Sequence, residues 1–460
     1  MNLKKGDVLE LTIEKIVAGG EGLGYYGDFA VFAPMSVPGD RLSLRLISVK
    51  KTYARGLIEK ILVSGPERVG GTENISFEDW QGCDFAMLRY EAQLKYKKII
   101  VEETLKGVGK LSGVVVADVA PSPQITHYRN KIIEPFRRQQ GKLITGFFRR
   151  RSHEVFAVRE NPLNSVLGNR IIEALTALCD EAGLSVYDET SGKGLLRHVM
   201  IRTNEAGQAM VVLVTNSGAA GKKETQVLHR LKDKFPEIRS LYISLNDRAT
   251  NVAIGKKNVH LWGEKTLREE IAGIRFHISP LSFFQINVKQ AANLYRKAIS
   301  LFGDIRGKTL VDAFSGTGTL AMLMAGEAGR VIAIEAVPEA SEDGRRTAAE
   351  NKIKNIDFMT GAVEDLLPKL TAGGEILDGV LFDPPRKGLD RHIPEVLAAS
   401  GIPCIVYISC DPATFARDAR ALTTLGYDLT EVFPFDMFPM VSHVECAARF
   451  DRKQLTQQEA

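Results

Sequence analysis

The last third of the chain alternates short apolar runs with segments in which apolar residues recur at helical spacing. Helical spacing covers residues 291–302, 320–325 and 339–351, and the apolar runs cover residues 309–312, 330–334, 379–382 and 405–408. Strands that alternate with helices in this way form a parallel sheet with helices on both faces. The pattern therefore predicts a doubly wound, Rossmann-like α/β domain, which we expect over residues 276–460.

Residues 1–62 carry a different pattern, in which apolar and polar residues alternate over short stretches. The stretches 7–13, 29–32 and 41–46 are separated by glycine-rich turns. Short strands at this spacing predict a small all-β, OB-like barrel of five strands. Barrels of this kind bind single-stranded nucleic acid, and a barrel without that role is the alternative that the pattern leaves open.

Residues 63–275 mix strands and helices without a catalytic signature, which predicts a central α+β domain. A helix is expected where Leu88, Ala92, Tyr96, Ile99 and Ile100 form one apolar stripe. The central domain also holds most of the excess positive charge. Residues 127–160 include nine Lys or Arg and three Glu, a balance of +6 in a chain of net charge +4.

Clustered basic residues indicate phosphate binding, so this segment is expected to hold RNA or DNA. Arg149, Arg150 and Arg151 follow Phe147 and Phe148. The aromatic residues favour a folded strand over a tail, and we expect the arginines to continue that strand. For any single arginine, a solvated strand face remains the alternative.

Composition excludes several classes of protein. With 460 residues, 44% hydrophobic and 25% charged, the chain is typical of a soluble globular protein of two or three domains. No apolar run reaches membrane-spanning length, and residues 1–7 lack the apolar core of a signal peptide. Five scattered cysteines argue against a disulfide framework and for a reducing compartment, so we expect a cytoplasmic protein without a membrane partner.

One cysteine lies where a parallel sheet presents its ligands. Cys410 follows the apolar run 405–408 and precedes Asp411 and Pro412, and Asp383 ends the preceding apolar run. The carboxyl ends of strands line the ligand crevice of an open α/β sheet. A free cysteine is often a buried small hydrophobe, but at a strand end we interpret Cys410 as a nucleophile beside a bound cofactor.

The cofactor is expected at the turn after the first strand of the sheet. Gly316 and Gly318 follow Asp312 there, and Glu335 ends the next strand. Glycines alone also match a dinucleotide fingerprint. The acidic residue before the turn is typical of S-adenosylmethionine enzymes, and Glu335 is placed to accept hydrogen bonds from ribose hydroxyls. The sequence therefore predicts an S-adenosylmethionine site.

Taken together, these motifs resemble those of bacterial RNA uracil-5-methyltransferases, in particular the branch that carries an N-terminal TRAM barrel and modifies 23S ribosomal RNA. The resemblance covers essentially the whole chain. Its motifs are residues 282–287, 312–318, Glu335, 383–388, 408–412, 417–418, 436–439 and 443–445.

The resemblance implies a role for each matching residue. Cys410 is the nucleophile and Glu445 the general base, for which an ordinary strand-surface glutamate is the alternative. Phe283 stacks on the target base, with core packing as the alternative. The implied cofactor contacts are Gln285, Asp312, Phe314, Gly316, Gly318, Glu335 and Asp383. The implied RNA contacts are Arg129, Lys131, Arg149 and Arg151.

The expected substrate is ribosomal RNA with an accessible uridine that is flipped out of its stack, and we expect a monomer. Methylation of the T-loop uracil of transfer RNA is the nearest alternative. Since relatives with that activity generally lack the barrel, its presence favours ribosomal RNA. A non-catalytic RNA-binding or assembly protein is the second alternative, against which the pair Cys410 and Glu445 argues.

Two departures from the family pattern stand out. Many members of the branch hold an iron–sulfur cluster on four cysteines, and the matching positions here are Asn74, Trp80, Cys83 and residues 160–161. One cysteine cannot hold a cluster that needs four ligands, so we predict none. The second departure is Val441, where the family usually has threonine.

Overall fold

The computed structural model describes residues 3–72, 82–149, 152–158, 160–216, 221–248 and 252–453. The chain divides into two units by its internal contacts, one of residues Met1–Pro123 with Lys289–Ala460 and the other of Gln124–Val288. The N-terminal residues 1–62 and the C-terminal residues from 289 onward therefore belong to one unit, and the basic segment 127–160 belongs to the other. The division into three domains at residues 62/63 and 275/276 stays a prediction.

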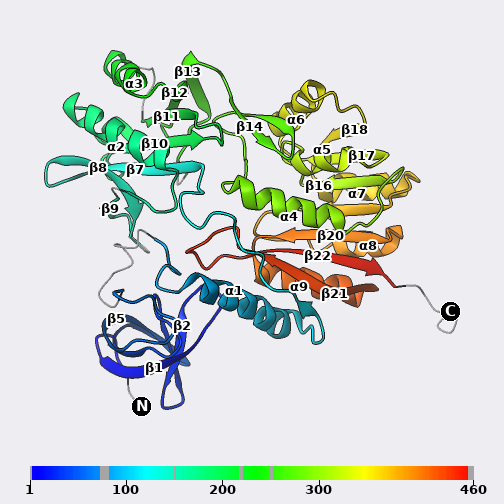
Figure 1. Ribbon diagram of the computed structural model, residues 1–460, viewed down its shortest axis with the longest axis horizontal. Helices are drawn as coiled ribbons and strands as arrows, with labels where there is room; N and C mark the ends of the chain where they lie inside the picture. Colours follow the sequence, from blue (N-terminus) through cyan, green and yellow to red (C-terminus); the bar gives the residue numbers. More distant parts are fainter. Residues whose placement is uncertain are drawn as a thin grey trace. The chain divides into compact units, whose positions relative to one another are not determined.

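The N-terminal strands form a closed barrel in the order β1-β2-β3-β5-β4, as the alternating pattern predicts (Figure 1). Alternate residues such as Leu9, Leu11, Leu42 and Leu44 point into its core because successive side chains of a strand face opposite sides. The strands are β1 (Val8–Ile16), β2 (Gly22–Tyr26), β3 (Phe29–Ala33), β4 (Arg41–Val49) and β5 (Tyr53–Val63).

The predicted helix after the barrel is α1 (Tyr90–Thr104), which continues into the π-helical turn η1 (Leu105–Gly109). Its stripe Ala92, Tyr96 and Ile100 is buried against Phe85 and Met87, and also against apolar residues at the mouth of the barrel. Ile99 lies at the edge of this cluster and is only partly buried. The stripe thus joins α1 to the barrel within the first unit.

The same unit contains an eight-stranded sheet in the order β18-β17-β16-β19-β20-β22-β21-β6. β22 runs antiparallel to both of its neighbours, and every other pairing in the sheet is parallel. The strands are β6 (Val115–Val116), β16 (Thr309–Ala313), β17 (Arg330–Glu335), β18 (Ile356–Thr360), β19 (Gly379–Phe382), β20 (Cys404–Ser409), β21 (Tyr427–Phe435) and β22 (Glu445–Arg452).

Helices follow the strands of this sheet, which confirms the doubly wound α/β fold. One face buries Val311, Ile332, Phe382 and Tyr407 against apolar side chains of α7, α8 and α9, such as Leu397. The strand order reverses between β16 and β19, where ligands of such sheets bind. The helices are α4 (Val288–Ser300), α5 (Thr319–Ala325), α6 (Pro338–Glu350), α7 (Val363–Ala372), α8 (Ile393–Ser400) and α9 (Pro412–Thr424).

The second unit is built on a seven-stranded sheet in the order β13-β12-β11-β10-β7-β8-β9, with the separate hairpin β14–β15. Its helices are α2 (Val166–Glu181) and α3 (Lys222–Lys234). The strands are β7 (Lys131–Gln139), β8 (Lys142–Phe148), β9 (Val155–Ala157), β10 (Leu196–Thr203), β11 (Ala209–Thr215), β12 (Ile238–Leu245), β13 (Lys257–Gly263), β14 (Leu267–Ile271) and β15 (Ile274–Ile278). The predicted mixed α+β character is confirmed.

Candidate active site

The strand register brings Cys410 and Glu445 to the same edge of the eight-stranded sheet. β20 pairs antiparallel with β22, and Ser409 lies opposite Cys446. Because partners in an antiparallel pair move in opposite directions along the chain, Cys410 comes next to Glu445. Asp383 follows β19, the parallel neighbour of β20, at this same edge. A thiol and two carboxyl groups therefore meet where β19 and β20 end and the antiparallel strand β22 begins.

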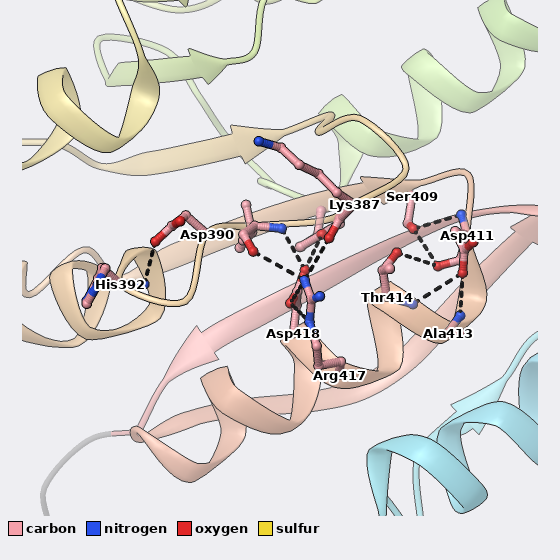
Figure 2. Close-up of polar contacts among 11 residues, drawn as sticks. Lys387, Asp390, His392, Ser409, Asp411, Ala413, Thr414, Arg417 and Asp418 are labelled. Atoms are coloured by element: carbon pink, nitrogen blue, oxygen red, sulfur yellow. Dashed lines mark hydrogen bonds and ion pairs between the residues drawn. The ribbon is translucent and has the colours of Figure 1, made fainter.

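The turn that carries Cys410 is held by hydrogen bonds on its C-terminal side (Figure 2). Asp411 caps α9, because its side chain accepts hydrogen bonds from the backbone N–H groups of Ala413 at 2.8 Å and Thr414 at 3.2 Å. The Ser409 hydroxyl donates to the Asp411 carbonyl oxygen at 3.0 Å. Cys410 is partly exposed, whereas the other four cysteines are buried. The fold thus presents this thiol to a ligand.

Asp418 ties the loop after Asp383 to the helix after Cys410 (Figure 2). Its carboxylate accepts hydrogen bonds from the Leu389 N–H and the Tyr407 hydroxyl, both at 2.8 Å, and from Arg417 Nε at 2.8 Å. A Cβ atom at Gly388 would lie 2.4 Å from Asp418 Oδ2, so only glycine fits there. The motif at residues 417–418 therefore positions the two strand-end loops relative to each other.

Buried acidic groups dominate the electrostatics of this edge. Burial, and then the nearby Asp383, raise the pKa of Glu445 to about 8. Burial raises the pKa of Asp383 to about 7. Burial and then the charges of Glu445 and Asp383 raise the pKa of Cys410 to about 11, against an opposing effect of Arg386. Near neutral pH the ligand-free site therefore favours the thiol over the thiolate, and a bound cation would lower the pKa of the thiol.

The loop between β16 and α5 has the features of a ligand cradle. Asp312 is fully buried, and its Oδ2 accepts a hydrogen bond from the Ala321 N–H at 2.8 Å. Its Oδ1 has no hydrogen-bond partner in the described part of the chain, and burial raises the pKa of the group to about 8. Phe314 adopts a φ of 66°, which is uncommon for a bulky residue and marks a constrained backbone.

The two glycines of this loop differ in their surroundings. Both have positive φ, 57° at Gly316 and 78° at Gly318. A Cβ atom at Gly318 would approach the ring of Phe358 to 2.9 Å, whereas one at Gly316 would meet nothing within 4 Å. Glycine at 318 is therefore required by packing, and glycine at 316 leaves open space beside the backbone.

Glu335 is oriented by this loop from the end of β17. Its Oε2 accepts a hydrogen bond from the Gly316 N–H at 2.8 Å, and its Oε1 accepts one from the Val337 N–H at 2.7 Å. Each carboxylate oxygen has a second lone pair for a further donor. Glu335 is therefore both fixed in place and able to accept hydrogen bonds from ligand hydroxyl groups.

The segment before Glu445 is anchored by residues that sequence reasoning did not single out. Lys97 of α1 forms an ion pair with Asp436, with both side chains fully buried, and donates to the Phe438 carbonyl oxygen at 2.9 Å. Asp84 accepts hydrogen bonds from the Ser442 N–H at 2.8 Å and from its hydroxyl at 3.0 Å. These pairs span more than 300 residues of sequence, so no local pattern could have indicated them.

The remaining predicted site residues lie in the second unit. Phe283 is 72% exposed, so it is not a core residue in this structure. Gln285 is buried, and its carbonyl oxygen accepts a hydrogen bond from Asn130 Nδ2 at 3.0 Å. Lys131 begins β7, and Arg129 precedes it.

The expectation that the arginine run continues its strand is wrong at Arg149. β8 ends at Phe148, and Arg149 closes a turn in which its N–H donates to the Glu154 carbonyl oxygen. The Arg149 side chain also forms an ion pair with Glu154 at 3.4 Å. Arg150 and Arg151 lie outside the described residues.

The positions that match the iron–sulfur ligands are only partly described. Cys83 is buried, and Asn161 is buried with its carbonyl oxygen accepting a hydrogen bond from Asn169 at 2.9 Å. Asn74 and Trp80 lie outside the described residues. Within the described ranges, no group of three or more His, Cys, Asp or Glu side chains is arranged to hold a metal ion. The absence of a cluster stays a prediction.

The fold is that of a methyltransferase, and the comparisons with known proteins agree. The tRNA (uracil-5-)-methyltransferase family model matches residues 89–453. An uncharacterized RNA methyltransferase of Fusobacterium nucleatum is 52% identical over 98% of this chain and 97% of its own. Another, of Clostridium acetobutylicum, is 37% identical over 96% of both chains.

A solved structure extends this likeness to the whole fold. The tRNA (uracil-54, C5)-methyltransferase of Pyrococcus abyssi, solved in complex with S-adenosyl-L-homocysteine, superposes with a TM-score of 0.77 at 28% identity. The match covers 96% of this chain and 100% of that one. The chain belongs to the tRNA (uracil-5-)-methyltransferase family.

A membrane-spanning role finds no support in the helices. Among the residues that the structure describes, no helix is long and apolar enough to cross a lipid bilayer.

Proposed function

We propose that this protein transfers a methyl group from S-adenosylmethionine to carbon 5 of a uridine in 23S ribosomal RNA. The observation that carries the proposal is the register between β20 and β22, which brings the Cys410 thiol beside the buried carboxyl group of Glu445. A nucleophile and a base are the two groups that methylation of this carbon requires.

Cys410 supplies the covalent step. Carbon 5 of uracil is a weak nucleophile, and addition of the Cys410 thiolate to carbon 6 converts the ring into an enolate in which carbon 5 is electron-rich. Carbon 5 would then take the methyl group of S-adenosylmethionine, whose sulfur–methyl bond breaks to leave S-adenosylhomocysteine. The partial exposure of Cys410, against the burial of the other four cysteines, supports this role.

Glu445 completes the reaction. After methyl transfer, carbon 5 carries a methyl group and a hydrogen. The Glu445 carboxylate removes that proton, the double bond between carbons 5 and 6 forms again, and the bond from carbon 6 to sulfur breaks to return the thiolate. Burial of Glu445 supports this role, because a raised pKa brings a carboxylate closer to the strength that a base needs near neutral pH.

The residues around the β16 turn fit the cofactor. Glu335 has lone pairs for the ribose hydroxyl groups, and the open space beside Gly316 admits a ligand against the backbone. The cofactor supplies the methyl group and a positive charge on sulfur. Asp312 is a buried carboxyl group and Asp383 a partly buried one, and a cation would stabilise both in their charged forms. We assign Phe314 and Gly318 to the same site on their match to the family motifs, and for Gln285 of the second unit the match alone implies a cofactor contact.

A transfer RNA uridine is the second candidate substrate. The Pyrococcus abyssi relative is a tRNA (uracil-54, C5)-methyltransferase and covers 96% of this chain, so the N-terminal barrel does not by itself separate the two substrates. What supports ribosomal RNA is the resemblance of the whole chain, barrel included, to the ribosomal branch of the family.

One experiment tests the function and chooses between the substrates. Ribosomal and transfer RNA from a strain that lacks the gene are digested, and 5-methyluridine is quantified by mass spectrometry. We expect a loss from 23S ribosomal RNA that the wild-type gene restores and Cys410→Ala does not. Cys404→Ala, at the opposite end of β20, is the matched control and should restore the modification.

The other outcomes are equally informative. A loss from transfer RNA instead supports the second candidate. No loss from either RNA, or full restoration by Cys410→Ala, would contradict the proposed reaction and leave a non-catalytic RNA-binding protein as the better account.

A further inference from the structure

Two basic side chains lie next to each other on the central sheet of the second unit. In the antiparallel pair of β7 and β10, Lys131 is directly opposite Arg202. Side chains of such partners lie on the same side of the sheet with their Cβ atoms about 5 Å apart. Alternation along the strands places them on the face that buries Ile133 and Met200, which is covered by Leu267 of β14.

Among the described residues, neither cation has a counter-charge. Arg202 is 2% exposed, its Nη2 donates to the Ser282 carbonyl oxygen, and its Nε has no hydrogen-bond partner in the described structure. The Lys131 side chain makes no hydrogen bond or ion pair with any residue that the structure describes. Glu134 alternates to the opposite face, and none of the undescribed residues of this unit is acidic.

This arrangement is costly for the free protein. A buried charge without a partner is among the more destabilising features of a folded chain. Burial and the repulsion of Arg202 lower the pKa of Lys131 to about 8, and burial lowers the pKa of Arg202 to about 10. By contrast, the neighbouring Arg197 donates to the carbonyl oxygens of Asn246 and Arg248. An anion between Lys131 and Arg202 would remove this cost.

The pair lies under the segment that carries Phe283. Arg202 contacts the Ser282 carbonyl oxygen, and the residue before Lys131, Asn130, is joined to this segment twice. Its side chain donates to the Gln285 carbonyl oxygen and its N–H to the Ile286 carbonyl oxygen, both at 3.0 Å. An exposed aromatic ring next to buried cations is the combination that binds a stacked base and its phosphate.

We propose that Lys131 and Arg202 together bind one phosphodiester group of the RNA, beside the nucleotide that stacks on Phe283. The inference rests on the proposed function in taking RNA as the substrate. The guanidinium group of Arg202 offers planar paired donors, and Lys131 adds a second positive charge. In the sequence, Arg202 lies outside the basic cluster of residues 127–160. In the folded sheet, the pairing of β7 with β10 brings it next to Lys131 of that cluster.

The test compares Lys131→Met, Arg202→Met and the double variant with Arg230→Met. Arg230 is an exposed arginine of the same unit that is already paired with Glu181 at 3.0 Å, so it controls for the change in net charge. Binding of a fluorescein-labelled uridine dodecamer is measured by anisotropy at several KCl concentrations, without methyl donor. Thermal unfolding is measured with and without sodium phosphate.

We expect each single variant to bind the oligonucleotide about tenfold more weakly, as for loss of a charge-assisted hydrogen bond. The double variant should lower the slope of log affinity against log salt by about 0.7, the value for one phosphate, not by twice that amount. Lys131→Met should unfold at a higher temperature than the wild type. Phosphate should stabilise the wild type and Arg230→Met but not the double variant.

An unchanged salt slope in the double variant would overturn the proposal, whether or not phosphate stabilises the wild type. If phosphate stabilises only the wild type and Arg230→Met while RNA binding is unchanged, the pair is a small-anion site and not an RNA contact. Because these measurements need no methyl transfer, their failure is distinguishable from failure of the proposed function, which appears as unaltered 5-methyluridine in the deletion strain.

Discussion

The carboxyl edge of the eight-stranded sheet and the covered face of the seven-stranded sheet hold ionisable side chains of opposite kinds, acidic in the first and basic in the second. The first gathers Glu445, Asp383 and Asp312, and the second holds Lys131 and Arg202. In both regions, no side chain of opposite charge among the described residues pairs with these groups. The interior between α1 and Asp436 is different, because there Lys97 neutralises the acid.

The opposite charges of the two regions indicate which ligand binds in each. An unpaired buried charge destabilises the free protein, so it is retained where a ligand of opposite charge binds. On this view the acidic region takes the sulfonium group of S-adenosylmethionine and the basic region takes an RNA phosphate. The paired charges of Lys97 and Asp436 serve structure alone. The predictions below test these assignments, beginning with the largest effect.

Glu445→Gln should reduce turnover by about 100-fold or more, because proton removal from carbon 5 is the task of this base. Methyl transfer should still occur, so the protein should accumulate covalently bound to RNA through Cys410. A band shift on a denaturing gel, sensitive to ribonuclease, measures the adduct. Glu395→Gln, an exposed change on α8, is the control. Normal turnover by Glu445→Gln would assign proton removal to another group.

Lys97→Met should destabilise the protein by about 3–5 kcal/mol, because it leaves the buried Asp436 carboxylate unpaired. The double variant Lys97→Met/Asp436→Leu should recover most of that loss, since apolar residues replace the whole pair. Urea unfolding measures both. If neither S-adenosylmethionine nor phosphate restores the single variant to the stability of the wild type, this ion pair is distinct from the two ligand regions. A single variant as stable as the wild type would contradict this account of the pair.

The pH dependence of stability should differ between the wild type and Glu445→Gln. The pKa of Glu445 is raised by folding, so its contribution to stability is complete at low pH and is lost as pH rises toward 8. Relative to the wild type, Glu445→Gln should therefore gain ~2–4 °C in unfolding temperature between pH 6 and pH 9. Glu395→Gln should show no such trend. A constant difference across this range would show that the Glu445 carboxyl group is ionised throughout.

Arg149→Met should have the smallest effect. Because Glu154 already pairs with this arginine, we expect the salt slope for RNA binding to change by less than the ~0.7 of one phosphate contact. The uridine dodecamer assay measures it beside the Lys131 and Arg202 variants. A change as large as that of the Lys131→Met/Arg202→Met double variant would move the main phosphate contact to the β8–β9 turn.

The sequence predicted those parts of the site that local pattern determines. Apolar runs that lead into Asp383 and Cys410 marked two strand ends. In the structure, each strand ends one residue before the named side chain. The glycine turn after Asp312 was equally visible. Glu445 was assigned only by resemblance, because its nearness to Cys410 depends on the antiparallel register of β22, which no local pattern encodes.

Long-range pairing explains what was missed. Arg202 lies in an apolar strand outside the basic cluster, and its nearness to Lys131 follows from sheet register alone. The expected arginine strand beyond Phe148 was wrong because Arg149 and Glu154 close a turn. In each case the contact that decides the structure joins two residues, and the composition of one segment does not show that they are close.

Proton release on cofactor binding tests the central claim most directly. Calorimetric titration at pH 7 in buffers of different ionisation enthalpy compares S-adenosylmethionine with S-adenosylhomocysteine, which lacks the positive charge on sulfur. A bound cation lowers the pKa values of Glu445, Asp383 and Asp312, so those groups lose protons. We predict net proton release with S-adenosylmethionine and little or none with S-adenosylhomocysteine. Equal proton exchange with both ligands, or proton uptake with S-adenosylmethionine, would contradict the account.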